Sequence, residues 1–152
     1  MANTQAMATS FKGELLNAYH NFSATNPART INTADSFKAA LYLASATINA
    51  ATPNYTTTGE VSGTNYTAGG VAITAWNAPT TSGTTGYTTP TASITYTNVT
   101  LSTAFDCVLV YNNSQGNRAV SAHTFGSQTV TAGTFTLTMP TNDATNALIR
   151  LA

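Results

Sequence analysis

Residues 54–76, NYTTTGEVSGTNYTAGGVAITAW, hold four of the ten glycines of the chain in a short space. These are Gly59, Gly63, Gly69 and Gly70. Glycine takes positive φ at little cost, whereas the intervening Tyr and Thr residues favour extended backbone. The pattern predicts a tight double turn, followed by a strand over residues 71–76. Glu60 lies between the two turns, where its carboxylate can accept hydrogen bonds from backbone amides that a glycine-rich bend leaves free.

The same glycines raise the question of a phosphate-binding loop. A P-loop requires a Lys followed by Ser or Thr at the start of a helix, and a dinucleotide fingerprint places its three glycines between a strand and a helix. In this chain the only matching glycine spacing is loose, and a strand follows. The sequence therefore favours a structural turn, and we expect no nucleotide or other cofactor.

Length and charge limit the classes of partner. A chain of 152 residues suits one domain with a single core, and we expect one β domain over residues 10–152 after an N-terminal arm over residues 1–9. Five basic and five acidic residues give zero formal net charge, so no long-range field attracts nucleic acid or an anionic membrane. No window reaches the length of a transmembrane span. We therefore expect neither nucleic acid nor a membrane as a partner.

The surface is expected to be polar but uncharged. Only 7% of the residues are charged and about a fifth are Thr, whereas about a quarter are charged in ordinary domains. Because 42% of the residues are hydrophobic, the chain should fold rather than stay disordered. A surface of Thr, Ser, Asn and Ala has little electrostatic protection against association. We therefore expect the chain to pack against copies of itself or against another protein.

The first half of the chain predicts few regular elements. Ser10 is placed to cap a short helix, which Gly13 weakens. From Asp35 the sequence alternates as a strand does, although a helix is the rival because Ala and Leu are good helix formers. One face of this strand would carry Phe37, Ala39, Leu41 and Leu43. Residues 77–92, NAPTTSGTTGYTTPTA, are of low complexity and predict a long exposed loop with Tyr87 at its middle.

The second half predicts strands only. Four segments have the composition or the period-two alternation of strands, and a short strand, ALIRLA, closes the chain. The four segments are residues 93–102, 105–113, 118–126 and 129–140. We expect a bulge at Asn98 and a turn over residues 113–117. Strands at this spacing, without intervening helices, indicate a mainly β fold, an antiparallel β-sandwich or jelly roll.

Few side chains suit catalysis. The only histidines are His20 and His123, and no metal-ligand spacing connects them with Cys107. Cys107 lies in an apolar stretch without a neighbouring base, which is typical of a small buried residue rather than a catalytic thiol. The five carboxylates come from unconnected segments, so no glycosidase pair is indicated. We expect no catalytic site, no metal site and no enzymatic activity.

Aromatic side chains provide an alternative of a different class. Sugar-binding modules with a sandwich fold use exposed aromatic rings as stacking platforms. Tyr66, Trp76 and Tyr87 are the candidates for such a contact, or for contact with a protein partner. Against this, a single Trp close to an apolar strand is more often a core residue. For Tyr87, an equally simple interpretation is a solvated loop in which the one tyrosine side chain folds back.

Three segments together resemble a family of small structural proteins of tailed bacteriophages. They are FKGELLNAYHNF (11–22), DSFKAALYLASATINAATPNYTTTGEVSGTNYTAGG (35–70) and TFTLTMPTNDATNALIRL (134–151). The family pattern has an FK..LL...H.F opening, a strand ending in ALY, a T.EVSG.GY..GG turn and a C-terminal GTFT......A.ALIRL run. The resemblance covers nearly the whole chain. Asn65 departs from it, since the pattern has Gly there.

The resemblance implies a virion structural protein. We expect a capsid decoration or cement protein that binds the outside of the head shell and stabilises contacts between major capsid protein subunits. Its partners would be the major capsid protein of the same phage and copies of itself. It would be made in the cytoplasm of the bacterial host and reside on the capsid surface, where the arm could lie along a capsid subunit. A tail or head-to-tail component is the first alternative, and a carbohydrate-binding adhesin on the virion is the second.

Overall fold

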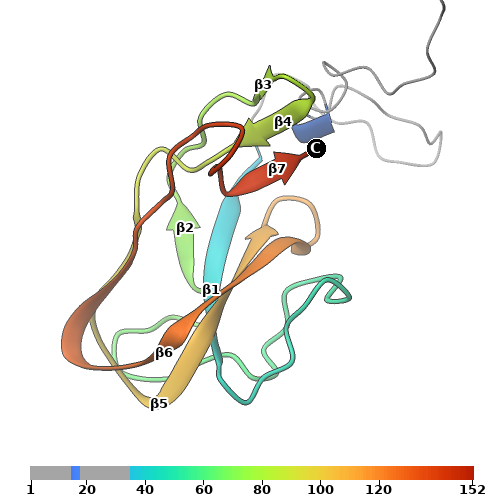
Figure 1. Cartoon of the computed structure of the whole chain (residues 1–152). Helices are drawn as coiled ribbons and strands as arrows, with labels where there is room; N and C mark the ends of the chain where they lie inside the picture. The colour runs from blue at the N-terminus through green and yellow to red at the C-terminus, as the bar shows by residue number, and fades with distance from the viewer. Residues whose placement is uncertain (1–14, 18–34) are drawn as a thin grey trace, which may run out of the picture. The chain divides into compact units, whose positions relative to one another are not determined.

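The computed structural model describes residues 15–17 and 35–152 (Figure 1). These residues belong to two compact units. The first, here called the core unit, consists of residues 35–74 and 92–138; the second, the terminal unit, has residues 15–17, 75–91 and 139–152 as its described part. Each unit contains one antiparallel sheet. The chain is therefore mainly β, and its two antiparallel sheets are consistent with the predicted β-sandwich.

The sheet of the core unit has four strands in the order β2-β1-β5-β6. Their bounds are β1 Phe37–Leu43, β2 Val71–Ile73, β5 Ile94–Asn112 and β6 Arg118–Leu137. β1 pairs with both β2 and β5, and β5 pairs along its length with β6 in a long hairpin that Figure 1 shows as strongly curved. The strand expected from Asp35 is confirmed as β1. β2 is shorter than the strand expected over residues 71–76.

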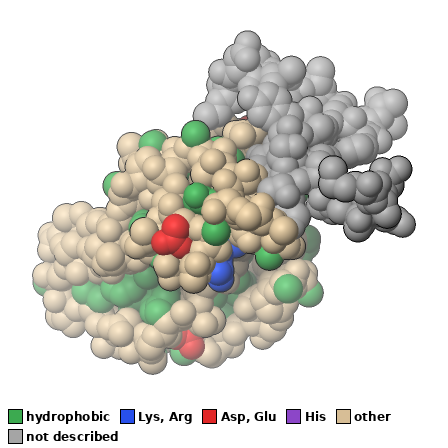
Figure 2. Space-filling view, turned by 45° about the horizontal axis from the view of Figure 1, so that its top comes forward, with side chains coloured by type: hydrophobic (Ala, Val, Ile, Leu, Met, Phe, Trp, Pro, Cys, Tyr) green, Lys and Arg blue, Asp and Glu red, His purple; other side chains and the backbone are tan. Residues whose placement is uncertain are grey.

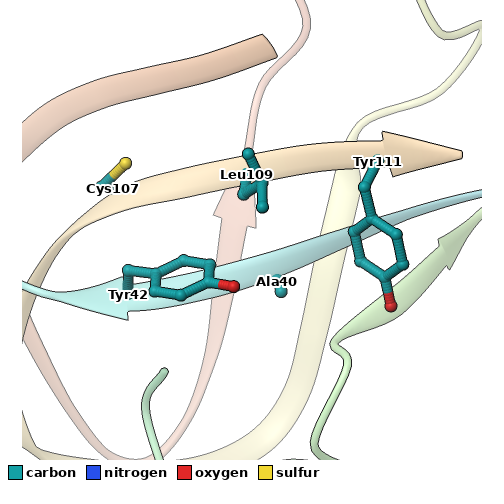
Figure 3. Packing of buried hydrophobic residues seen from close by; sticks show 5 residues of the cluster. All are labelled: Ala40, Tyr42, Cys107, Leu109 and Tyr111. Atoms are coloured by element: carbon teal, nitrogen blue, oxygen red, sulfur yellow. The ribbon is translucent and has the colours of Figure 1, made fainter. Parts of the chain in front are cut away.

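β1 lies inside the sheet and is buried on both faces. Ala39, Ala40, Leu41 and Tyr42 all have zero exposure. On one face, Ala40 lies opposite Leu109 and Tyr42 lies opposite Cys107, and Tyr111 completes the cluster (Figure 3). The loop after β1 covers this cluster with Ala46, Ile48 and Tyr55. The cluster therefore joins the two central strands to the segment that leads into the glycine-rich turn.

A second, aromatic cluster forms where the hairpin curves. Phe105 packs edge-on against Phe135, with ring centroids 5.0 Å apart, and Phe125 lies 5.4 Å from Phe135. Tyr96 lies 6.1 Å from Phe135 and 6.0 Å from Tyr66. Phe105 and Tyr96 on β5 are buried, whereas Phe125 and Phe135 on β6 are only half-buried. The aromatic side chains of this cluster are therefore less buried on β6 than on β5.

Two predictions for the second half were wrong in detail. The segments 93–102 and 105–113 are one strand, β5, and the segments 118–126 and 129–140 are nearly all one strand, β6. Breaks in the strand register absorb the small polar residues that suggested strand ends, with shifts between Leu101 and Phe105 and between Phe105 and Cys107. The predicted bulge at Asn98 is confirmed by a register shift and a φ of 52°. The predicted turn over residues 113–117 is confirmed as well.

The terminal unit contains a three-stranded sheet in the order β3-β4-β7. The bounds are β3 Thr80–Ser82, β4 Thr85–Thr88 and β7 Ile149–Leu151. The exposed loop predicted over residues 77–92 was therefore wrong, because a tight turn at Gly83 (φ 57°) folds it into a hairpin. Thr89 is buried, and its Oγ1 accepts a hydrogen bond from the amide of Leu148 at 2.9 Å. The final strand, β7, is confirmed.

The N-terminal predictions lie mostly outside the described residues. The arm over residues 1–9, the domain boundary after it and the cap at Ser10 are not among them. Of the expected helix, only Leu15 to Asn17 are described, and Leu15 and Leu16 have helical backbone. In the part of the chain that the structure covers, no helix is long and apolar enough to cross a membrane.

Candidate functional site

The carboxylate of Glu60 is the centre of the most connected polar cluster of the core unit. Its Oε2 accepts a hydrogen bond from the hydroxyl of Tyr55 at 2.6 Å. Its Oε1 accepts two, from the hydroxyl of Tyr66 at 2.7 Å and from the amide of Gly69 at 2.7 Å. Hydrogen bonds to a carboxylate are short and strong because the acceptor is charged. One side chain therefore fixes both ends of the glycine-rich segment.

Other tyrosines extend this cluster to the strands. Tyr66 also accepts a hydrogen bond from the buried amide of Leu41 at 3.0 Å, which ties the turn to the middle of β1. Three further hydroxyls donate to backbone carbonyls: Tyr42 to Thr56 at 2.6 Å, Tyr96 to Ala39 at 2.8 Å and Tyr111 to Gly69 at 2.7 Å. Five of the seven tyrosines of the chain thus donate hydrogen bonds in this network. Four of them fix the segment 55–69, and Tyr96 joins β5 to β1.

These phenols are held in their protonated form. Burial raises the pKa of Tyr42 to about 12, because a phenolate would lose its hydration. Burial also raises the pKa of Tyr96, and that of Tyr66 is raised by burial and then by its hydrogen bond to Glu60. A phenol that stays protonated remains a donor at all ordinary pH values. The cluster is therefore suited to structural cross-linking rather than to proton transfer.

The turn requires glycine at its several positions for different structural reasons. Gly59, Gly69 and Gly70 adopt φ values of 78°, 89° and 71°. Gly70 also lies against β1, since a Cβ there would come within 1.7 Å of the carbonyl oxygen of Ala39. Gly63 has no positive φ, but a Cβ would lie 1.9 Å from the carbonyl oxygen of Thr100. The turn therefore needs glycine both for its dihedral angles and for close backbone contact.

Asn65 adopts a backbone conformation that favours glycine. Its φ is 59°, in the left-handed region that Asn tolerates better than most residues. Its side-chain amide donates a hydrogen bond to the carbonyl of Asn98 at 2.8 Å. Asn98 is itself a bulge residue with positive φ. Asn65 thus fits the turn and adds a contact to β5.

The three aromatic residues considered for partner contact occupy different settings. Tyr66 is half-buried, with its hydroxyl on Glu60 and its ring stacked on Tyr96. In the terminal unit, Trp76 is half-buried and forms an isolated bridge with Pro90, and Tyr87 is half-buried within β4. None of the three is a fully exposed ring on a loop. The sequence did not indicate that Tyr42, Tyr55, Tyr96 and Tyr111 belong to the cluster around Glu60. The available signal was their position, since three of them lie in expected strands and Tyr55 lies in the glycine-rich stretch.

The two residues considered for catalysis are shielded. Cys107 is buried, and burial, with Asp106 adjacent, raises the pKa of its thiol. His123 contacts Ser121, with 2.8 Å between Nε2 and Oγ, and burial lowers its pKa. Among the residues that the structure describes, no group of three or more His, Cys, Asp or Glu side chains is placed to hold a metal ion.

An open hollow of about 690 Å³ lies inside the loop after β1. It is lined by residues 45–49, 51–56, 58 and 59, which include Thr47, Asn49 and Tyr55 but no charged side chain. Two of its side chains already bind backbone amides: Thr52 Oγ1 accepts from Asn49 N at 3.0 Å, and Asn49 Oδ1 accepts from Ala51 N at 2.8 Å. The hollow therefore offers hydroxyl groups and a phenol ring but no group that could act as an acid or base near neutral pH.

Comparison with known proteins gives no relative. The chain matches no protein family model, no curated protein and no solved structure.

Proposed function

We propose that the chain is a non-enzymatic structural protein of a tailed-bacteriophage virion that decorates the capsid. It would bind the outside of the head shell and stabilise contacts between major capsid protein subunits, and many copies would cover one shell. The virion class is supported by the similarity of residues 11–22, 35–70 and 134–151 to small phage structural proteins. The decoration role is supported by the character of the surface.

The observation that carries the proposal is β6. This strand is 20 residues long, contains no fully buried residue and has one charged side chain, Arg118. It is rich in Thr, and Figure 2 shows a face of the molecule on which charged side chains are few. Such a surface associates through shape and backbone hydrogen bonds rather than through charge. Contacts of this kind are individually weak, and they suffice when a lattice presents many binding sites.

The non-enzymatic part of the proposal is supported by the state of the reactive groups. The thiol of Cys107 is buried with a raised pKa, and the carboxylate of Glu60 is occupied by three hydrogen-bond donors. A nucleophile or a general base needs access to a substrate. Both groups are instead used to hold the fold together.

The experiment that tests the proposal is a count of copies in purified particles of the phage that encodes the chain. Quantitative mass spectrometry against the major capsid protein gives this number. A count on the order of hundreds per particle is expected, because a decoration protein follows the capsid lattice. A count of a few to a few dozen would overturn the capsid role and assign the chain to the tail or the head-to-tail region. Absence from the particle would overturn the virion class as well.

A further inference from the structure

The outer edge of β6 is unpaired over most of its length. Within the described residues, β6 pairs with β5 on one side, and on the other side only its first residues have a partner. There the extended segment at Pro53 to Tyr55 runs antiparallel to it, with Ala119 N donating to Pro53 O at 3.0 Å and Tyr55 N donating to Asn117 O at 2.9 Å. The edge thus already pairs with a short extended segment at its start. Beyond residue 119, no strand of the described residues pairs with this edge.

Bulges divide this edge into short regular pieces. The register with β5 shifts between Val99 and Leu101, where Ala132 takes a φ of 45°, and shifts again at three places toward the turn. Bulges are a common way to protect an edge strand from further pairing. The last piece of β6 is regular, with Leu137, Thr136 and Phe135 opposite Ile94, Thr95 and Tyr96. The register shift between Tyr96 and Val99 places its extra residue on β5, so β6 itself has no extra residue over 133–137. This segment is therefore the part of the edge best suited to pairing.

The apolar face of this segment is incompletely covered. Ile94 and Tyr96 on β5 are 5% and 2% exposed, whereas their partners Leu137 and Phe135 on β6 are half-buried. Side chains of one strand cover those of the next at a spacing of about 4.8 Å, so a missing neighbour leaves the edge residues partly in water. Phe135 is held in place by Phe105 and Phe125. It therefore offers a rigid aromatic surface at the edge.

The sequence of the segment identifies the partner. Residues 134–136 read Thr-Phe-Thr, which is the same in both directions. If two copies pair antiparallel about Phe135, each Thr134 lies opposite a Thr136, and the two Phe135 rings lie opposite each other. Aromatic pairs and Thr pairs on one face are favourable cross-strand combinations. The segment carries no charge, and Arg118 lies at the far end of the strand, so the pairing meets no like-charge repulsion.

We infer that residues 133–137 of β6 pair with the same residues of a second copy of the chain, antiparallel and with a two-fold axis at Phe135. The two four-stranded sheets then continue as one. The interface is small, so the dimer is weak in solution and forms at concentrations on the order of 100 µM. The inference requires only this chain, and it is tested on the purified protein without capsids. Its failure would therefore leave the proposed capsid role to its own experiment.

The test uses paired charge substitutions at Thr134 and Thr136, which are both exposed. Sedimentation velocity over a concentration series is expected to show dimers of the unaltered chain. In the proposed dimer, Thr134→Lys/Thr136→Lys places two pairs of like charges opposite each other across the interface. The variant Thr134→Glu/Thr136→Glu does the same with negative charges. Each variant alone is expected to dimerise at least about tenfold more weakly than the unaltered chain. An equimolar mixture of the two is expected to recover the dimer, because each Lys then faces a Glu.

The matched control is Thr95→Lys/Thr97→Lys. These two threonines are exposed on β5, one strand inward from the edge, and give the same change of net charge. The control is expected to dimerise like the unaltered chain, and far-ultraviolet circular dichroism checks that each variant is folded. A chain that stays monomeric over the whole concentration series would overturn the inference. So would a dimer that survives the Lys substitutions, or a Lys and Glu mixture that remains monomeric.

Discussion

At the scale of single residues, Glu60 decides the conformation of the turn. A half-buried carboxylate loses hydration and stabilises the fold only if the protein supplies donors in place of water. Here two phenols and one amide do so at 2.6 to 2.7 Å. The sequence places Glu60 between two glycine turns and predicts that its carboxylate accepts hydrogen bonds from backbone amides. The tyrosine donors were not predictable, because Tyr66 and Tyr55 approach Glu60 only once the chain has turned twice.

Tyr66 is the residue at which this cluster can be tested. Tyr66→Phe removes one donor to Glu60 and leaves the amide of Leu41 without its acceptor. A buried group that loses its hydrogen bond costs about 1–3 kcal/mol, and we expect this decrease in the free energy of unfolding. Urea denaturation followed by circular dichroism measures it. Tyr87→Phe, on β4, is the matched control and should change the value by less than about 0.5 kcal/mol. Equal effects of the two variants would contradict the role given to Tyr66.

At the scale of elements, the β5–β6 hairpin shows how composition misleads a strand prediction. Small polar residues after Leu101 and near Gln128 suggested that strands end there, but both strands continue. The strands instead change register, with extra residues on one side or the other. A continuous pair of strands is favoured because each backbone group then keeps a partner. Such long-range pairing is decided by both strands together and not by either segment alone.

Ala132 gives a direct test of one of these bulges. Its φ of 45° is unfavourable for a residue with a Cβ, and its amide is held by Thr100 Oγ1 at 3.0 Å. Ala132→Gly should remove the strain and stabilise the protein by up to about 1 kcal/mol. At an ordinary strand position, by contrast, glycine destabilises the protein. Ala122→Gly, in a regular part of β6, should instead destabilise it by about 1 kcal/mol. Midpoints of urea unfolding would distinguish the two, and a destabilised Ala132→Gly would contradict the strained bulge.

At the scale of the whole molecule, the tyrosines determine how stability depends on pH. Burial raises the pKa of Tyr42 to about 12 and also raises the pKa values of Tyr66, Tyr96 and Tyr111, whereas an unfolded tyrosine titrates near 10. Between these values the unfolded chain binds fewer protons than the folded chain, so the free energy of unfolding falls as the pH rises. The stabilisation is complete below pH 10 and is lost above it.

We therefore expect cooperative alkaline unfolding between about pH 10 and 12. Each phenol that ionises only in the unfolded chain lowers stability by about 1.4 kcal/mol per pH unit in this range. Absorbance at 295 nm, which reports phenolate, should rise together with the loss of the circular dichroism signal. Tyr96 is a buried donor with only 2% of its surface exposed, and Tyr96→Phe should reduce the steepness of the pH dependence. If most phenolates appeared near pH 10 in a chain that stays folded, the arrangement of the cluster would be wrong.

The sequence by itself determined the mainly β class, the strand at β1, the glycine-rich turn and the bulge at Asn98. These features depend on residue type and local spacing, since alternation, β-propensity and tolerance of positive φ act over a few neighbouring residues. Only the tertiary structure decided that four expected strands are one curved hairpin, that residues 77–92 form strands and that tyrosines surround Glu60. Those features depend on contacts between residues far apart in the chain, such as Tyr96 with Ala39 and Tyr111 with Gly69, and no local pattern encodes them.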